Sequence, residues 1–311
     1  MAFLRGFGAH LPTRAVANDV LAARLGVTPE WIYEVSGIQE RRYAGPNETV
    51  ASMASGAARD CLSKTGVTAG DVEMVILASG SSERRFPGPA CAVARDLGIT
   101  EAPAIDLPIA SAGSLFGMAL AAKLVAAYRN ILVIASEKMS TVVEHEPMDR
   151  NVDILFGDGA GACLVSDQNG RARIVDLLIQ SDGSFAEDLK LEFGRPLEMN
   201  GRSVIMQASR KIPRAILQIL ERNQAPPSSV DIFLMHQANQ NLIDRVAKAI
   251  GVPASRFYSN IKRYGNTSSA SMLIAAAEWW AASGGPKPGV PLCFAAFGAG
   301  FHWGAVLAVG V

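Results

Sequence analysis

The 311-residue sequence lacks an excess of charge of either sign, with 29 lysines and arginines against 29 aspartates and glutamates. Proteins that bind nucleic acid usually carry a basic excess, so a nucleic-acid partner is not expected. The sequence has no apolar run close to the ~20 residues of a membrane-spanning helix, and its N-terminus lacks the layout of a signal peptide. We therefore expect a cytoplasmic protein that does not enter a membrane.

Cysteine and histidine are scarce, with four of each in the chain. They are Cys61, Cys91, Cys163, Cys293, His10, His145, His236 and His302. The cysteines have neither zinc-site spacing nor a disulfide-rich context, so each is expected to be a small buried apolar side chain in a reducing compartment. The histidines show no ligand spacing, and the glycine-rich run over 157–161 opens no helix, so neither a metal nor a nucleotide cofactor is expected.

Apolar residues make up 49% of the chain, and the order of predicted elements is similar in its two halves. In the first half, the patterns predict helices over 49–65, 89–97 and 111–128 and strands over 74–78, 102–107, 131–135 and 161–165. In the second half, they predict helices over 203–222, 241–250 and 268–282 and strands over 232–235, 256–259, 291–296 and 303–309. Corresponding positions are offset by about 155 residues.

This repeat predicts a duplicated α/β protein with two similar halves, residues 1–170 and 171–311. The strands are continuously apolar, as expected for sheets that are covered on both faces. Such a duplication suggests a pseudo-twofold arrangement, in which the starts of the two long central helices can face each other across one site. Those starts lie near Ser111 and Asn266.

Three polar clusters interrupt the apolar elements. Ser111 lies at a strand-to-helix turn, where free backbone N–H groups favour developing negative charge, although an N-cap would have the same position. His236 follows an apolar strand, where either a catalytic residue or a core histidine could lie. Asn266 precedes a helix, where a cap or turn role is the simpler interpretation. Its correspondence to Ser111 in the repeat favours a shared site.

Together these clusters supply a nucleophile, an imidazole that can handle protons, and an amide donor. That set suits acyl transfer through a covalent intermediate. The glycine-rich turn over 297–300 could add a backbone N–H for an oxyanion hole. From the residues alone, a capping or core role stays open for each of the three side chains.

Motifs along the whole chain resemble those of the ketoacyl-acyl carrier protein synthase III family. They are Trp31, Gly37-Ile38, the segment 46–49, Phe86-Pro87, Asp149-Arg150, and the segments 156–162, 236–239, 265–268 and 297–301. The resemblance implies a five-layered αβαβα thiolase fold and a homodimer. It also implies that an acyl group passes from acyl-CoA to an active-site residue and is then condensed with a malonyl thioester on a carrier protein, with loss of carbon dioxide.

The resemblance also implies roles for individual residues. Ser111 would carry the acyl group, and His236 and Asn266 would bind the thioester carbonyl and stabilise the enolate. The oxyanion hole would consist of the backbone N–H groups of Ser111 and Ala299. The substrate and CoA would contact Trp31, Arg150, Phe86, Met199, Asn239 and Phe297, with Phe86 reaching across the dimer. No resident cofactor is implied, because acyl-CoA is a substrate.

The main departure from the family is Ser111, which stands where the family has its nucleophilic cysteine. A serine hydroxyl does not ionise as a thiol does and needs a general base, and no Asp or Glu lies beside His236 in sequence. The serine is either an engineered substitution or the natural residue, and the unusual segment 107–109 favours the second. The protein could then be a condensing enzyme, a non-condensing acyltransferase or hydrolase, or a non-catalytic subunit. The retained His236 and Asn266 favour condensation.

Positions that bind partners also depart from the family. Val35 stands where an arginine contacts CoA, and neither Met206 nor Asn241 is basic, although basic residues that dock the carrier protein are expected near them. A substitute basic patch could form from Arg210, Lys211, Arg214, Arg245, Lys248, Lys262 and Arg263. These side chains could equally form an ordinary solvated surface.

Overall fold

The computed structural model describes residues 1–143 and 148–311. Within these ranges one large mixed sheet has the strand order β5-β4-β6-β7-β1-β8-β13-β12-β11. Its strands are β1 (Ala2–His10), β4 (Met74–Ala78), β5 (Ala104–Leu107), β6 (Asn130–Lys138), β7 (Asp158–Ser166), β8 (Ala172–Ser181), β11 (Ile232–Met235), β12 (Pro291–Gly298) and β13 (His302–Gly310). Strands β4, β7 and β11 are buried along their whole length, on both faces, which explains their largely apolar runs.

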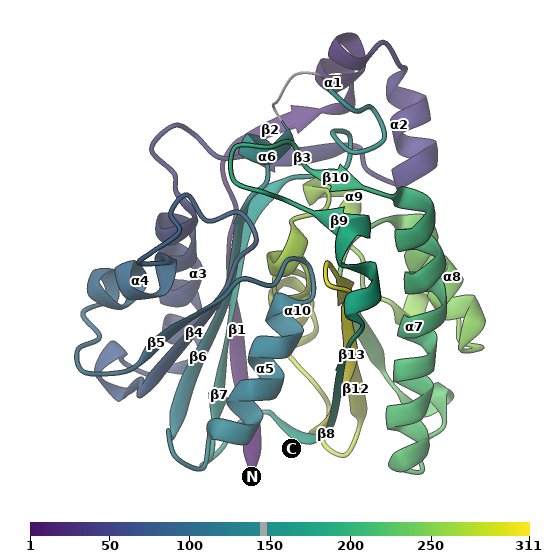
Figure 1. The fold of residues 1–311 in the computed structure, drawn as a ribbon. Helices are drawn as coiled ribbons and strands as arrows, with labels where there is room; N and C mark the ends of the chain where they lie inside the picture. Colours follow the sequence, from purple (N-terminus) through teal and green to yellow (C-terminus); the bar gives the residue numbers. More distant parts are fainter. Residues whose placement is uncertain (144–147) are drawn as a thin grey trace.

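The strand order is similar in both directions from the centre of the sheet (Figure 1). At the centre, residues 2–4 of β1 pair antiparallel with residues 172–174 of β8. On one side β7, β6 and β4 follow, with β4 parallel to β6; on the other side β13, β12 and β11 follow, with β11 parallel to β12. The predicted duplication is therefore present. The boundary between residues 170 and 171 stays a prediction, because β8 pairs with strands of both halves.

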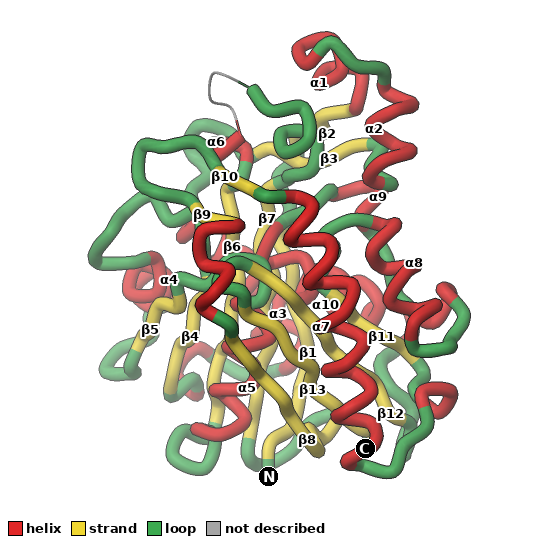
Figure 2. Tube along the Cα trace, turned by 45° about the vertical axis from the view of Figure 1, so that its right-hand side comes forward, coloured by secondary structure: helices red, strands yellow, loops and turns green. Residues whose placement is uncertain are grey.

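Helices cover both faces and also separate the two sets of strands, which gives five layers (Figure 1). α3 (Val50–Thr65) and α4 (Pro89–Leu97) cover the N-terminal strands, and α7 (Gly201–Arg222) and α8 (Gln240–Ala249) cover the C-terminal strands. In Figure 2, α7 runs in front of the C-terminal strands. α5 (Gly113–Leu124) and α10 (Ser271–Ser283) form the middle layer, with buried apolar clusters on either side. The predicted α/β class and five-layered thiolase fold are confirmed.

The two central helices begin later than predicted. The helix predicted from Ser111 begins at Gly113, because Ser111 has a left-handed φ of 60°. The helix predicted from Ser268 begins at Ser271 after a 3-10 turn over Ser268–Ala270, and Ser268 has a φ of 45°. Left-handed backbone is unfavourable for residues other than glycine, so surrounding contacts must hold both serines in this conformation.

Other elements also differ from the prediction or were missed by it. The strand predicted over 256–259 is a single bridge between Phe257 and Phe233, because a 3-10 turn over Ala254–Arg256 precedes it. β1 and β8, which join the halves, were not predicted. The remaining short elements are α6 (Ser140–Val143), β9 (Leu189–Lys190), β10 (Glu198–Met199) and α9 (Ile261–Tyr264). In the described part of the chain, no helix combines the length and apolar character needed to cross a bilayer.

A small cap covers one end of the sheet (Figure 1). It consists of β2 (Arg14–Ala17), α1 (Asn18–Leu25), α2 (Pro29–Ser36) and β3 (Glu40–Tyr43). Arg41 is fully buried and donates hydrogen bonds to Asn18 Oδ1 (2.8 Å) and the carbonyl oxygen of Ile154 (2.8 Å). Burial lowers the pKa of Arg41 to about 10, so the side chain stays charged at neutral pH. It therefore ties the cap to the loop before β7.

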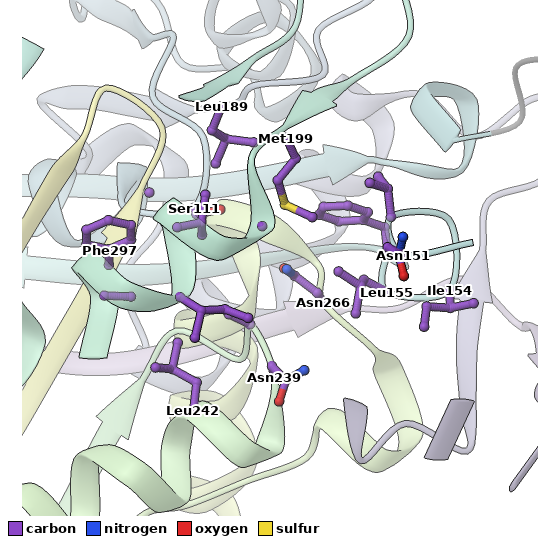
Figure 3. Close-up of a pocket in the computed structure, with 18 of the residues that line it drawn as sticks. Ser111, Asn151, Ile154, Leu155, Leu189, Met199, Asn239, Leu242, Asn266 and Phe297 are labelled. Carbon is purple, nitrogen blue, oxygen red and sulfur yellow. The ribbon is translucent and has the colours of Figure 1, made fainter. Parts of the chain in front are cut away.

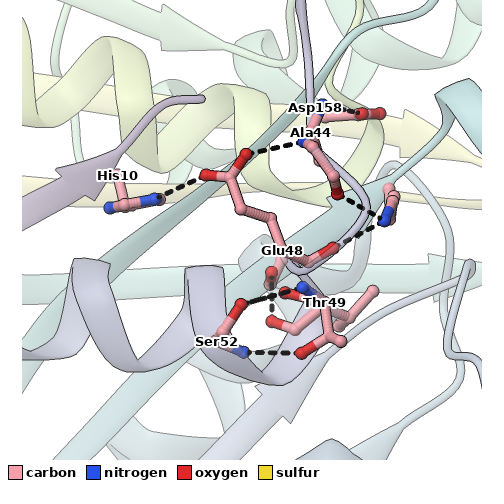
Figure 4. A network of polar contacts seen from close by, with 10 residues as sticks. His10, Ala44, Glu48, Thr49, Ser52 and Asp158 are labelled. Carbon is pink, nitrogen blue, oxygen red and sulfur yellow. Dashed lines mark hydrogen bonds and ion pairs between the residues drawn. The ribbon is translucent and has the colours of Figure 1, made fainter. Parts of the chain in front are cut away.

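A second polar network fixes the loop between β3 and α3 (Figure 4). Asp158 accepts hydrogen bonds from the backbone N–H of Ala44 (2.7 Å) and from the backbone N–H and hydroxyl of Ser140 (2.7 and 2.6 Å). Glu48 lies 3.6 Å from His10, at the end of β1. Burial raises the pKa of Asp158, and the hydrogen bonds that it accepts oppose this rise. The network joins the cap to β1 and β7.

Candidate active site

A cavity of about 480 Å³ lies between the cap and helices α7 and α8 (Figure 3). Ser111, His236 and Asn266 all line it, although they follow different strands and loops. Most of the remaining wall is apolar, and it includes Val152, Ile154, Leu155, Phe156, Leu189, Val204, Ala208, Ile212 and Leu242. The fold thus brings the three predicted side chains together in a space of the size that holds small-molecule ligands.

Ser111 occupies the turn between β5 and α5 and is 9% exposed. The structure gives no side-chain cap to α5, so the capping interpretation of Ser111 is wrong. Within the described residues, no hydrogen bond engages its hydroxyl. The left-handed turn therefore presents a side-chain oxygen to the cavity close to the beginning of a helix, where developing negative charge is favoured.

The residues predicted for the oxyanion hole have different surroundings. The backbone N–H of Ser111 donates a hydrogen bond to Ser268 Oγ at 3.0 Å, so it is already engaged. Ala299 does not line the cavity, whereas its neighbour Gly298 does. A side chain at position 298 would collide with the carbonyl oxygen of Ala110 at 2.2 Å, so only glycine allows this close approach. The oxyanion role of Ser111 and Ala299 stays a prediction.

His236 follows β11 and is 4% exposed. Its Nδ1 lies 2.6 Å from Ser271 Oγ, and the same oxygen accepts a hydrogen bond from the backbone N–H of Gln237 at 3.0 Å. Burial lowers the pKa of His236 to about 4, although a hydrogen bond with the backbone of Ser268 acts in the opposite direction. The imidazole is therefore neutral at pH 7. Because a hydroxyl contacts Nδ1, the arrangement is not a Ser-His-carboxylate triad.

Asn266 is held by hydrogen bonds of its backbone and of its side-chain oxygen Oδ1. Its N–H donates to the carbonyl oxygen of Leu155 (2.8 Å), and its carbonyl oxygen accepts from the N–H of Gly157 (3.0 Å). Asn266 Oδ1 accepts a hydrogen bond from the N–H of Ser268 at 2.8 Å, which is a turn role. Since Oδ1 is engaged, Nδ2 is the group left to donate a hydrogen bond to a ligand.

Four of the residues predicted to bind substrate line this cavity: Trp31, Met199, Asn239 and Phe297. The Arg150 guanidinium lies 5.9 Å from the ring centre of Trp31, at the rim. Asn239 donates a hydrogen bond from Nδ2 to the carbonyl oxygen of Val35 (2.8 Å) and also caps α8. Phe86 is 85% exposed and does not line the cavity of the single chain. The binding roles of all six residues stay predictions.

Sequence reasoning missed the polar residues that support the site. Ser268 and Ser271 contact Ser111 and His236, but in sequence they look like part of a helix start. Glu137 is fully buried and accepts hydrogen bonds from the hydroxyls of Ser269 (2.6 Å) and Ser81 (2.5 Å). A glutamate at the end of the apolar strand β6 was the available signal, because a buried carboxylate needs partners.

Two members of the possible basic patch are engaged elsewhere. Lys211 forms an ion pair with Asp182 (3.1 Å), and Arg263 forms an ion pair with Glu278 (2.9 Å).

His145 lies outside the described residues. Among residues 1–143 and 148–311, no group of three or more His, Cys, Asp or Glu side chains could hold a metal ion. Three of the four cysteines are buried, whereas Cys91 is exposed, which corrects the expectation for that residue.

Fold and cavity together define a thiolase-fold enzyme of the acyl-transferring, condensing type. Residues 105–183 match the family described as 3-oxoacyl-[acyl-carrier-protein (ACP)] synthase III, and residues 220–309 match the description of its C-terminal part. The chain is 33% identical to the β-ketoacyl-[acyl-carrier-protein] synthase III of Nostoc sp. strain PCC 7120, over 98% of this chain and 96% of that protein. The chain therefore belongs to the β-ketoacyl-[acyl-carrier-protein] synthase III family.

Solved structures agree with this assignment. The crystal structure of 3-oxoacyl-[acyl-carrier-protein] synthase III from Aquifex aeolicus VF5 superposes with a TM-score of 0.94 at 32% identity, and the match covers 99% of this chain and 100% of that one. The priming β-ketosynthase of the R1128 polyketide pathway superposes with a TM-score of 0.92 at 29% identity, over 100% and 96% of the two chains. The predicted family is thus confirmed.

The buried His236 should make the protein less stable as the pH falls. Its pKa is about 4 in the folded chain against an ordinary value of 6.5, so between these values only the unfolded chain binds the proton. The free energy of unfolding should therefore fall from pH 6.5 towards pH 4, by roughly 3 kcal/mol from this residue. Urea unfolding at several pH values should show a shallower fall for His236→Gln. If the free energy of unfolding falls equally steeply with pH in both proteins, the pKa of His236 is not lowered in the folded chain.

Proposed function

We propose that the chain transfers an acyl group from acyl-CoA to Ser111 and then condenses it with a malonyl thioester. The observation that carries the proposal is the meeting of Ser111, His236 and Asn266 on the wall of one largely apolar cavity. These groups supply a nucleophilic oxygen and two neutral polar groups beside it. The rest of the wall can exclude water from an acyl ester and from a carbanion.

In the first step, Ser111 Oγ attacks the carbonyl carbon of the acyl thioester. A C–O bond forms, the C–S bond breaks, and the serine proton ends on the CoA sulfur. His236 is the nearby group that can carry this proton, but its pKa is lowered to about 4 and its Nδ1 contacts a hydroxyl. An imidazolium there would gain little stabilisation, so proton transfer should limit the rate of acylation.

In the second step, the malonyl carboxylate leaves as carbon dioxide, and the bonding electron pair forms an enolate. The enolate oxygen accepts hydrogen bonds from Asn266 Nδ2 and from His236. Since Oδ1 of Asn266 is held by Ser268, its amide is already aimed as a donor. The enolate carbon then attacks the acyl ester, a C–C bond forms, and the C–O bond to Ser111 breaks as the serine oxygen takes a proton from solvent, which replaces the one that left with CoA.

Around the mouth, Trp31 and Arg150 would hold the adenine of CoA, and an acidic carrier protein would dock on α7. The docking surface would be one face of that helix, on which side chains recur every four residues. These side chains are Arg202, Met206, Arg210 and Arg214. Arg202 also lines the cavity. Within the described residues none of the three arginines has an ion-pair partner, and all are exposed. This face would supply the positive charge that positions 206 and 241, occupied here by Met206 and Asn241, do not provide.

Reversing two of these charges should weaken the interaction with a carrier protein. With Arg210→Glu and Arg214→Glu together, KM for a malonyl-carrier substrate should rise about 10-fold at low ionic strength, and added salt should reduce the difference. Turnover of malonyl-CoA should not change, because neither residue lines the cavity. Lys287→Glu, in the loop before β12, is the matched control. An unchanged KM would show that the carrier docks elsewhere or is not used.

We also propose a homodimer without a resident cofactor. Phe86 and Phe193 are 85% and 62% exposed, and large exposed aromatic side chains on neighbouring loops are typical of an interface. The guanidinium of Arg85 lies 4.7 Å from the ring centre of Phe193, which places the two loops together. In a dimer, Phe86 would reach the acyl site of the other subunit. The division into residues 1–170 and 171–311 is part of this proposal, as is a cytoplasmic location.

The proposed function is tested by mixing the protein with an acyl-CoA and a malonyl thioester. Condensation requires CoA, carbon dioxide and a 3-oxoacyl thioester to form in equal amounts, and Ser111→Ala should abolish the 3-oxoacyl product. Free CoA without carbon dioxide would indicate a non-condensing acyltransferase or hydrolase instead. If none of the three products forms, the non-catalytic interpretation stands.

A further inference from the structure

Lys211 is the one member of the expected basic patch that α7 turns into the protein beside the site. Its side chain is 18% exposed, and its Nζ lies 3.1 Å from Asp182 Oδ2. The same Nζ lies 3.8 Å from the ring centre of Trp303 and 5.5 Å from that of Phe185. A carboxylate and two aromatic faces therefore surround a largely buried ammonium group, which offsets the cost of its burial.

Asp182 connects this ammonium group to the turn between β12 and β13. The N–H of Asp182 donates to the carbonyl oxygen of Phe301 (2.8 Å), and the N–H of Phe301 donates to the carbonyl oxygen of Asp182 (2.9 Å). The Phe301 ring is fully buried and stacks on Phe185 at 5.2 Å between ring centres. Lys211 thus contacts both the residue that is hydrogen-bonded to the turn and the ring that is stacked on it.

The turn needs such an anchor because of its own sequence. Gly298 and Gly300 lie on either side of Ala299, and glycine restricts the backbone least of all residues. Yet Gly298 lines the cavity, and Phe297 packs on Phe301 at 4.8 Å between ring centres. The pairing of β12 with β13 ends at Gly298 and His302, so the backbone N–H groups of 299–301 depend on contacts from outside this ladder for their direction.

We propose that Lys211 is a positioning residue for the turn over 298–301. It holds Asp182 and Phe185, these two hold Phe301, and Phe301 fixes the backbone that faces Ser111. The inference rests on the proposed function, because the turn affects the rate only if its backbone stabilises charge during acyl transfer. It assigns no contact between Lys211 and the substrate.

Lys211→Met removes the charge and keeps a long apolar side chain. For acyl transfer from acyl-CoA, its kcat should fall about 10- to 100-fold while KM changes less than about twofold, because a misaimed donor weakens only the transition state. Amide hydrogen exchange over 298–301 should become faster. Lys211→Arg should keep kcat within about threefold of wild type. Arg222→Met is the matched control, because Arg222 also forms an ion pair from α7, with Asp176 of β8 at 2.6 Å.

The proposal is overturned if Lys211→Met leaves both kcat and exchange over 298–301 unchanged, or if Arg222→Met has the same effect. It is also overturned if exchange rises while kcat stays at the wild-type value. If the wild-type protein transfers no acyl group at all, the proposed function fails, and the exchange measurement alone decides whether Lys211 anchors the turn.

Discussion

Replacing Ser111 by cysteine should accelerate acyl transfer from acyl-CoA by about 10²- to 10⁴-fold, the range that general-base assistance usually contributes. A cysteine thiol near the beginning of α5 can ionise close to neutral pH, so it needs no base. The serine hydroxyl does need one, and the imidazole of His236, which lines the same cavity, has its pKa lowered to about 4 and a hydroxyl on Nδ1. Rapid-quench mass spectrometry of a single turnover measures the rate directly.

Ser114→Cys provides the control for a thiol placed inside α5, three residues after position 111. Ser114 is fully buried in the first turn of α5, does not line the cavity, and has no hydrogen-bond partner for its hydroxyl in the described structure. Its cysteine variant should acylate at the wild-type rate. If Ser111→Cys is no faster than wild type, deprotonation of residue 111 does not limit the reaction, and the mechanism proposed for the first step is wrong.

Replacing Asn266 by aspartate should slow decarboxylation of a malonyl thioester by about 10²- to 10³-fold, the usual cost of losing one oxyanion donor. Aspartate keeps the oxygen that accepts from the N–H of Ser268, but it removes the Nδ2 donor and adds a negative charge beside the enolate. Acylation of residue 111 should change much less, because the enolate forms only in the second step. Release of labelled carbon dioxide measures the effect.

Asn223→Asp, at the end of α7, is the matched control, because Asn223 is remote from the cavity lining. It should leave the release of carbon dioxide unchanged. If Asn266→Asp decarboxylates at the wild-type rate, Asn266 serves only as the turn residue that its contacts with Leu155, Gly157 and Ser268 also support. The non-condensing acyltransferase would then be the better description of the enzyme.

The apolar runs of the sequence predicted most of the fold. The strands over 74–78 and 232–235 and the helix over 89–97 have the predicted bounds, because each is an apolar or amphipathic run with a clear stop. The starts of α5 and α10 were wrong, since a left-handed φ at a serine depends on tertiary contacts rather than on local preference. β1 contains two glycines and an arginine, which obscured its apolar pattern.

For the site, the duplication was more informative than any single motif. It led to the expectation that the region of Ser111 faces that of Asn266, and the structure places both on one cavity wall. Their chemical roles stay predictions. The partners of these residues could not be predicted, because Ser271 contacts His236 across 35 positions and Lys211 contacts Asp182 across 29. Whether a lysine faces solvent or a neighbouring element depends on packing, which sequence spacing does not show.

The most direct test of the central claim is the mass of the intact protein after incubation with an acyl-CoA. The account predicts that the wild-type chain gains one acyl group, that peptide mapping places it on Ser111, and that a malonyl thioester removes it as a 3-oxoacyl product. If the wild-type chain gains no acyl mass while Ser111→Cys does, the serine is not a working nucleophile, and the proposed covalent mechanism does not apply to this protein.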